Sequence, residues 1–177
     1  KKARAKGVGV VAINTEDPAG ADKAGYQAYV GGRLADHGYK IGSMMVAEYG
    51  LKAGDHVLFG VELPGLNYAQ QRYAGVSKAL DEAGVTSEVL GTGEMIEESL
   101  TKISQYLIGH PETDAVIGGG GAPTAAAPDA VEQAGLDIPT GGFDVQPQIL
   151  DNILSGRSLA TIDQMPYLQG FYTVLQL

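Results

Sequence analysis

Polar side chains that could bind a ligand follow several short apolar runs of the sequence. Asn14, Glu94, Asp144 and Gln164 each come just after such a run, and Arg72 lies a short distance beyond another. In an open parallel sheet the carboxyl ends of the strands form one edge, and ligands bind there. Amides, carboxylates and a guanidinium together can make paired hydrogen bonds to neighbouring hydroxyl groups. The ordinary alternative is that these residues close turns and cap helices.

The elements that would position these residues alternate along the chain. Apolar side chains recur every three or four residues in stretches that predict helices, whereas short β-branched or apolar runs bounded by turn residues predict strands. Such an alternation is typical of an α/β fold, an open parallel sheet with helices on both faces. The strands are expected over residues 8–13, 27–30, 55–61, 86–90, 115–118, 140–143 and 159–162, and the main helices around 41–45, 69–83, 96–107 and 149–154.

Both ends of the chain interrupt a periodic segment, which predicts a part of a longer protein. Lys1 begins a helix-like stretch that has no N-cap residue, and Leu177 ends an apolar periodic segment that has no C-cap. Residues 20–160 contain no long linker and are expected to form one layered α/β structure. The apolar side chains of the flanks, such as Val8 and Phe171, would then face residues outside this sequence.

Composition and charge exclude several classes of function. The 177 residues carry a formal net charge of −9 and contain no cysteine. Nucleic acid and anionic membrane surfaces are therefore unfavourable partners, and zinc–thiolate sites and cysteine nucleophiles are impossible. His37, His56 and His110 form no pair at helical spacing, so neither a metal site nor a catalytic site is expected. No run of residues is apolar and long enough to span a membrane.

A run of four glycines, Gly118–Gly121, separates a predicted strand from a predicted helix. With Asp144 after the next strand, it resembles a dinucleotide-binding turn. That motif would need a third glycine where Pro123 and Thr124 stand. A nucleotide-binding enzyme is therefore the weaker interpretation, and we expect the glycines to allow close approach of a ligand or another lobe.

Several segments resemble the type I periplasmic sugar-binding proteins of the ribose-binding group. They are residues 7–14, Leu63-Pro64-Gly65 with Arg72, and residues 111–116, 142–144 and 160–166. The effector-binding cores of LacI-like repressors share this fold and are the first alternative. The resemblance extends over the whole chain but covers only the second half of such a protein.

This resemblance implies a domain organisation and a function. Residues 1–15 would form the end of an N-terminal lobe and a first crossover, residues 16–160 the C-terminal lobe, and residues 161–177 a second crossover and a helix that returns to the N-terminal lobe. The protein would be a non-enzymatic, cofactor-free component of a sugar-type ABC importer. It would bind a small neutral sugar or polyol between two lobes and deliver it to a membrane permease. A signal peptide would direct it to the periplasm, or a lipid anchor to the cell surface.

The resemblance also assigns roles to single residues. Arg72, Asp144 and Gln164 match residues that hydrogen-bond the sugar, Asn14 matches an acidic residue of the first crossover, and Glu94 falls near an aromatic contact. Gly120 stands where ribose binders have a polar amide, and residues 31–40 would form a longer loop. These departures predict a ligand that need not be ribose.

Two of these assignments have simple alternatives. Arg72 could form a salt bridge to Glu62 on the surface of its helix, and Asp144 could cap the helix that begins near Pro147.

Overall fold

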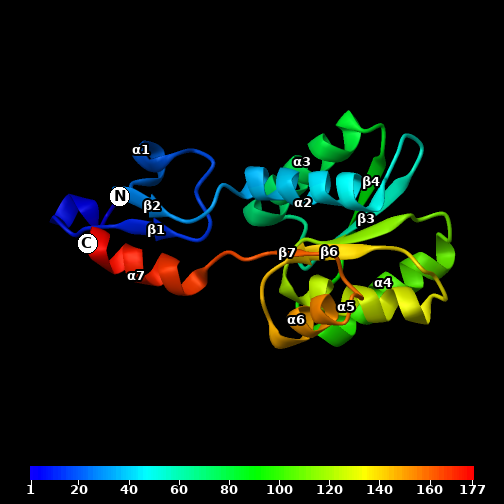
Figure 1. Ribbon diagram of the computed structural model, residues 1–177. Helices are drawn as coiled ribbons and strands as arrows, with labels where there is room; N and C mark the ends of the chain where they lie inside the picture. The colour runs from blue at the N-terminus through cyan, green and yellow to red at the C-terminus, as the bar shows by residue number, and fades with distance from the viewer. The chain divides into compact units, whose positions relative to one another are not determined.

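A computed structural model describes the backbone of residues 1–177 and every side chain except that of Ala21. The chain divides into two compact units (Figure 1). The smaller unit contains residues 1–34 and 164–177, and the larger contains residues 35–163. These boundaries differ from the division at residues 15 and 160 that the sequence favoured. The assignment of the units to two lobes of a binding protein remains a proposal.

The larger unit is built on a five-stranded, wholly parallel sheet, as predicted. Its strand order is β4-β3-β5-β6-β7, so that β3 and β5 are central neighbours. The strands are β3 (His56–Val61), β4 (Thr86–Gly91), β5 (Ala115–Gly118), β6 (Thr140–Phe143) and β7 (Thr161–Ile162). The fold class predicted from the sequence is confirmed.

Helices cover both faces of this sheet because its central strands are apolar on both faces. In β3, Phe59 packs with Ile41 and Leu80 in one cluster, whereas the adjacent Leu58 packs with Ile103 and Leu107 in another. Successive side chains of a strand point to opposite faces, which produces this division. Figure 1 shows α2 (Leu34–Tyr49) and α3 (Asn67–Glu82) on one side of the sheet, and α4 (Ile96–Gly109), α5 (Gly121–Gln133) and α6 (Pro147–Leu154) on the other.

The smaller unit contains a two-stranded parallel sheet, β1 (Val11–Ile13) and β2 (Ala28–Val30), with α7 (Pro166–Gln176) packed against both strands. A short helix, α1 (Ala21–Ala24), connects the strands, and a 3₁₀ turn (Arg4–Lys6) precedes them. The prediction that residues 27–30 join the large sheet is wrong, since β2 pairs with β1. A strand of three residues has too few side chains to indicate which sheet it joins.

Apolar side chains on α7 are widely exposed in this unit. Tyr167, Phe171, Val174 and Leu175 each have more than half of their surface accessible to solvent. No helix in the described part of the chain is both long and apolar enough to cross a membrane.

Residues 31–40 do not form the loop that was expected, because α2 begins at Leu34. Gly38, within this helix, serves helix packing. A Cβ atom on Gly38 would collide with the carbonyl oxygen of Arg72, and one on Gly75 would collide with the carbonyl oxygen of Ala35. Helices α2 and α3 therefore meet backbone to backbone, which only glycine permits at these positions.

We predict that Gly75→Ala destabilises the protein, because the new methyl group can be accommodated only if the two helices move apart. Overpacking of this kind costs about 2 kcal/mol, which corresponds to a decrease of about 4–8 °C in the thermal midpoint of a protein of this size. The matched control is Gly109→Ala at the end of α4, where a Cβ atom meets nothing within 4 Å. Equal midpoints for the two variants, measured by circular dichroism, would contradict the proposed close contact.

Candidate functional site

A cavity of about 590 Å³ opens at the carboxyl edge of the large sheet, where open α/β sheets bind ligands. Its walls come from the segments that follow four successive strands of the sheet. Two of the predicted site residues, Glu94 and Asp144, are among the lining residues. The full set is Glu62, Leu63, Leu66, Tyr68, Glu94, Met95, Ile96, Glu97, Gly121, Ala122, Asp144 and Gln146.

Asp144 is held in a left-handed backbone conformation at the end of β6, with φ of 76°. Its backbone N–H donates to the carbonyl of Ile162 at 3.0 Å, and its own carbonyl accepts from Thr161 Oγ1 at 2.7 Å. A non-glycine residue in this conformation costs free energy and persists only where its surroundings enforce it. The N-cap of α6 is Gln146, so Asp144 does not have the capping role that the sequence left open.

Arg72 is almost completely buried, with 3% of its surface exposed. Its Nη1 donates to the carbonyl of Gly119 at 2.7 Å. Its guanidinium carbon lies 4.3 Å from the centroid of the Phe143 ring and 5.2 Å from that of Tyr68. Arg72 is not among the lining residues of the cavity, so the structure gives it a supporting position, and its direct contact with a ligand remains a prediction.

The charge of Arg72 is stabilised by two carboxylates at longer range. Burial lowers the pKa of its guanidinium, whereas Asp144 and then Glu62 raise it. Glu62 thus attracts Arg72 through space, without the surface salt bridge considered as an alternative. The pKa of His37 is lowered, first by burial and then by the positive charge of Arg72. Its imidazole is consequently neutral at pH 7.

Glu62 and Tyr68 are site residues that were not selected from the sequence. Glu62 Oε2 accepts a hydrogen bond from the Tyr68 hydroxyl at 2.9 Å, and Oε1 accepts one from the backbone N–H of Ala122 at 3.3 Å. Burial, followed by the charge of Glu62, raises the pKa of Tyr68, so its hydroxyl remains a donor at neutral pH. The available signal was position, since Glu62 directly follows β3.

The glycine run packs against side chains of its own unit. A Cβ atom on Gly118 would collide with Thr124, one on Gly119 with Phe59, and one on Gly120 with the carboxylate of Glu62. The expectation that the glycines admit a ligand or another lobe is therefore wrong for these three positions. A carboxylate at the N-terminus of α5 also opposes a polyphosphate, which argues against nucleotide binding.

The hydroxyl of Thr124 connects the glycine run to β6. Thr124 Oγ1 donates to the carbonyl of Gly120 at 2.6 Å and accepts from the N–H of Phe143 at 3.0 Å. The strand end that carries Asp144 is thereby fixed to the start of α5.

The remaining two predicted residues, Asn14 and Gln164, belong to the smaller unit, which brings them together. Asn14 Nδ2 donates to Gln164 Oε1 at 3.3 Å. Asn14 also has a left-handed backbone, with φ of 67°, and its carbonyl accepts from the Tyr29 hydroxyl at 2.9 Å. Within the smaller unit, this pair places amide donors and acceptors next to each other, where the chain leaves β1 and just before α7.

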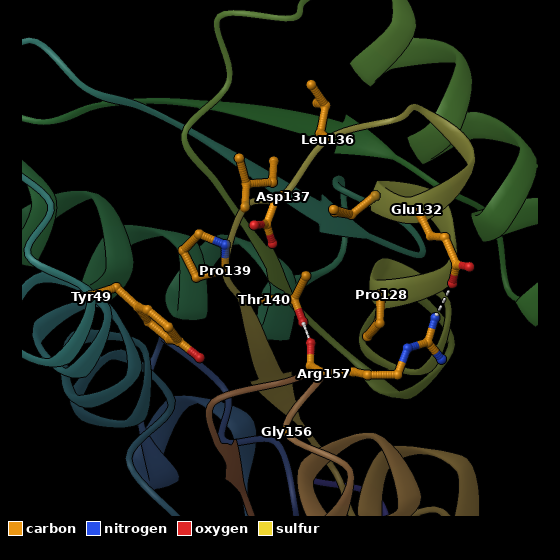
Figure 2. A pocket seen from close by; sticks show the side chains of 11 residues that line it. Tyr49, Pro128, Glu132, Leu136, Asp137, Pro139, Thr140, Gly156 and Arg157 are labelled. Atoms are coloured by element: carbon orange, nitrogen blue, oxygen red, sulfur yellow. Dashed lines mark hydrogen bonds and ion pairs between the residues drawn. The ribbon is translucent and has the colours of Figure 1, made fainter.

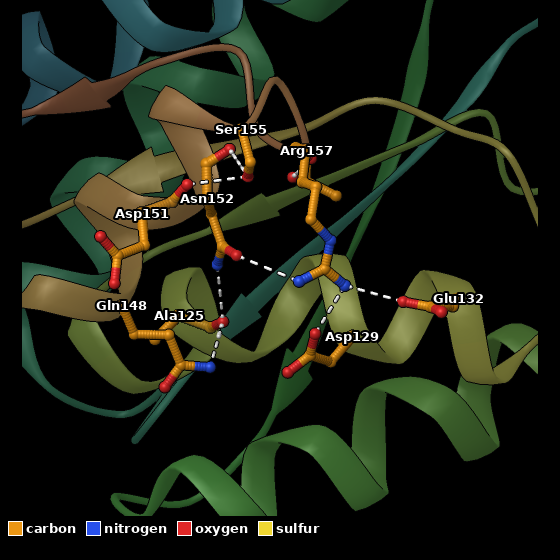
Figure 3. Close-up of polar contacts among 9 residues, drawn as sticks. Ala125, Asp129, Glu132, Gln148, Asp151, Asn152, Ser155 and Arg157 are labelled. Atoms are coloured by element: carbon orange, nitrogen blue, oxygen red, sulfur yellow. Dashed lines mark hydrogen bonds and ion pairs between the residues drawn. The ribbon is translucent and has the colours of Figure 1, made fainter.

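A second cavity, of about 550 Å³, lies at the opposite ends of the strands, near the start of β6 (Figure 2). Several of its polar side chains bond within the protein: Thr140 Oγ1 donates to the carbonyl of Arg157 at 3.1 Å. Arg157 in turn donates to Asp129 at 2.6 Å, to Glu132 at 2.9 Å and to Asn152 at 3.3 Å (Figure 3). This network connects α5 to α6, so we assign it a structural role.

The chain was compared with known proteins. The family model for the periplasmic binding protein domain matches residues 1–177. The chain is 34% identical over 145 residues to a D-ribose/D-allose-binding protein of Pseudomonas aeruginosa, with 77% of this chain and 46% of the relative covered. It is 27% identical over 172 residues to the xylose/arabinose-binding protein XylF of Sulfolobus acidocaldarius, with 92% and 42% covered. The chain thus spans less than half the length of these relatives.

Solved structures show the same fold. A carbohydrate transporter from Acidothermus cellulolyticus in complex with myo-inositol superposes with a TM-score of 0.81 at 26% identity, over 96% of this chain and 57% of that one. A periplasmic sugar-binding protein from Legionella pneumophila superposes with a TM-score of 0.88 at 20% identity, over 99% and 65%. At the lower identity the likeness concerns the fold alone.

We predict that Arg72→Lys destabilises the protein although it retains the positive charge. An ammonium group can neither stack on Phe143 as a guanidinium does nor reproduce the geometry of the bond to Gly119. Losing a hydrogen bond from a charged donor costs roughly 1.5–3 kcal/mol. The matched control is Arg157→Lys, an ion-paired arginine that is more than a third exposed, for which we expect less than about 1 kcal/mol. Chemical denaturation would measure both variants, and equal losses would contradict the supporting role of Arg72.

Proposed function

Because the chain belongs to the periplasmic binding protein family, we propose that it is part of the solute-binding component of a sugar-type ABC importer. The ligand proposed is a small neutral sugar or polyol, bound at the cavity along the carboxyl edge of β3, β4, β5 and β6. The protein binds and releases this ligand without chemical change.

The observation that carries this proposal is the position of Asp144, whose backbone is held at the end of β6, on the wall of the cavity. A carboxylate accepts hydrogen bonds from two hydroxyl groups at once, which suits neighbouring hydroxyls of a sugar. Its backbone is held by β7, so little freedom is lost when a ligand binds. The named ligands of the relatives, which are pentoses, D-allose and myo-inositol, share this arrangement of neighbouring hydroxyls.

The other predicted residues have complementary roles in this proposal. Arg72 supports the glycine run and Phe143, and the charge of Asp144 stabilises its guanidinium. Glu94, which is exposed and also lines the cavity, accepts from another hydroxyl of the ligand. The roles of Asn14 and Gln164, which belong to the smaller unit, rest on the family resemblance alone.

Partner and location follow from the family as part of the same proposal. A solute-binding component delivers its ligand to a membrane permease. It acts in the periplasm, or at the cell surface with a lipid anchor. The negative charge of the chain is consistent with a neutral ligand, and it disfavours nucleic acid as a partner.

We predict that Asp144→Ala weakens sugar binding by the full-length protein. Removal of hydrogen bonds to a charged acceptor costs roughly 1.5–3 kcal/mol each, equivalent to about a ten- to hundredfold increase in Kd. Titration calorimetry with D-ribose, D-allose, D-xylose, L-arabinose and myo-inositol would identify the preferred ligand and measure the loss.

The matched control is Asp151→Ala, an exposed aspartate of α6 outside the cavity, which should leave the Kd unchanged. An unaltered Kd for Asp144→Ala would remove this residue from the site. A wild-type protein that binds no sugar or polyol would overturn the proposed function itself.

A further inference from the structure

Glu62 occupies the space that a side chain at residue 120 would fill. The backbone of Gly120 is extended, with φ of −162°, so that its conformation does not require glycine. A Cβ atom there would instead collide with both carboxylate oxygens of Glu62. Glycine at residue 120 therefore makes room for the Glu62 carboxylate beside the N-terminus of α5.

This carboxylate has unused hydrogen-bonding capacity toward the cavity. A carboxylate offers about four acceptor positions, and the Tyr68 hydroxyl and the Ala122 N–H use one each. These two donors fix the orientation of the group. Because Glu62 also lines the cavity, the remaining positions can accept from a ligand.

Glu62 and Asp144 each lie close to one of two consecutive residues, Gly120 and Gly121. A Cβ atom on Gly120 would collide with the Glu62 carboxylate, and a Cβ atom on Gly121 would lie 3.2 Å from Asp144 Oδ2. Consecutive Cα atoms are about 3.8 Å apart, so a single small molecule can reach both carboxylates. Two acceptors in this arrangement require two hydroxyl donors, and both repel an anionic ligand.

From this geometry we infer that Glu62 is a specificity-determining residue, which accepts a second hydroxyl of the ligand and excludes sugar acids. The inference rests on the proposed function and narrows it: the ligand is an uncharged polyol with hydroxyl donors directed to both Glu62 and Asp144. Gly120 contributes to the same specificity, because the absence of a side chain there leaves room for the Glu62 carboxylate beside the N-terminus of α5.

The test compares Glu62→Gln and Gly120→Ala in the full-length protein by titration calorimetry with D-allose, myo-inositol and D-glucuronate. Glu62→Gln replaces one acceptor oxygen by a donor and removes the charge. It should weaken binding of the neutral ligands about ten- to hundredfold. Binding of D-glucuronate should weaken less or become stronger, so that the ratio of affinities for neutral and acidic ligands falls at least about tenfold. Gly120→Ala should have the same effect, because the end of the flexible glutamate side chain moves away from the new methyl group. The controls are Glu48→Gln, an exposed glutamate of α2, and Gly109→Ala.

The outcomes separate this inference from the proposed function. Parallel losses for neutral and acidic ligands would indicate a purely structural role and would overturn the inference. So would an unchanged Kd for Glu62→Gln in a protein whose sugar binding is weakened by Asp144→Ala, and the proposed function would then stand. A wild-type protein that binds none of the neutral probes would overturn both.

Discussion

The buried guanidinium of Arg72 is the contact on which the carboxyl edge of the large sheet depends. It originates from α3, donates to the carbonyl of Gly119 after β5, and stacks on Phe143 at the end of β6. One side chain thereby connects three elements that border the cavity. Its burial is unfavourable, as the lowered pKa indicates, and the charges of Asp144 and Glu62 offset part of this cost. The carboxylates proposed to bind a ligand therefore also stabilise the cation that supports them.

The position of Arg72 depends in turn on the close contact of α2 with α3. The carbonyl of Arg72 occupies the space that a side chain at Gly38 would need, and Gly75 makes the reciprocal contact with Ala35. A larger residue at either glycine would push α3 outward and withdraw the guanidinium from Phe143. Turns account for part of the glycine-rich composition, since nine glycines have a positive φ, and close packing accounts for others. Gly38 and Gly75 leave room for the backbone of the facing helix, whereas the glycine run leaves room mainly for side chains.

The sequence was informative wherever a property of a single segment decides the structure. Periodicity located the strands and the main helices, and the order of these elements gave the parallel sheet, because a strand buried on both faces has a distinctive composition. The membership of β2 in the smaller sheet and the start of α2 were not predicted. They depend on which partner a three-residue strand finds and on a helix that contains Gly38 and Gly42, and neither is a local property.

The same distinction applies to the candidate site. Asp144 and Glu94 were predicted correctly to lie at the carboxyl edge, because residues that follow parallel strands must meet there. The burial of Arg72 could not be predicted. An arginine in a helix is expected to be exposed unless small neighbouring residues are known to leave space for its side chain. Glu62 was passed over for the same reason. Its role depends on Gly120, which is distant in sequence and contributes only the absence of a side chain where the Glu62 carboxylate lies.

That pairing of a glycine with a distant carboxylate has a consequence for how a binding site of this fold can change its specificity. A polar group can reach the N-terminus of α5 from residue 120 itself or, as here, from Glu62 at the end of β3, and the two routes exclude each other sterically. An amide at residue 120 would both donate and accept, whereas Glu62 only accepts and adds a negative charge. The exchange thus changes the hydrogen-bonding character of the site while the backbone stays the same. In this chain the Glu62 carboxylate is also held by Tyr68 and Ala122, so it is fixed before any ligand arrives, which favours tight binding of a ligand that supplies the matching donor.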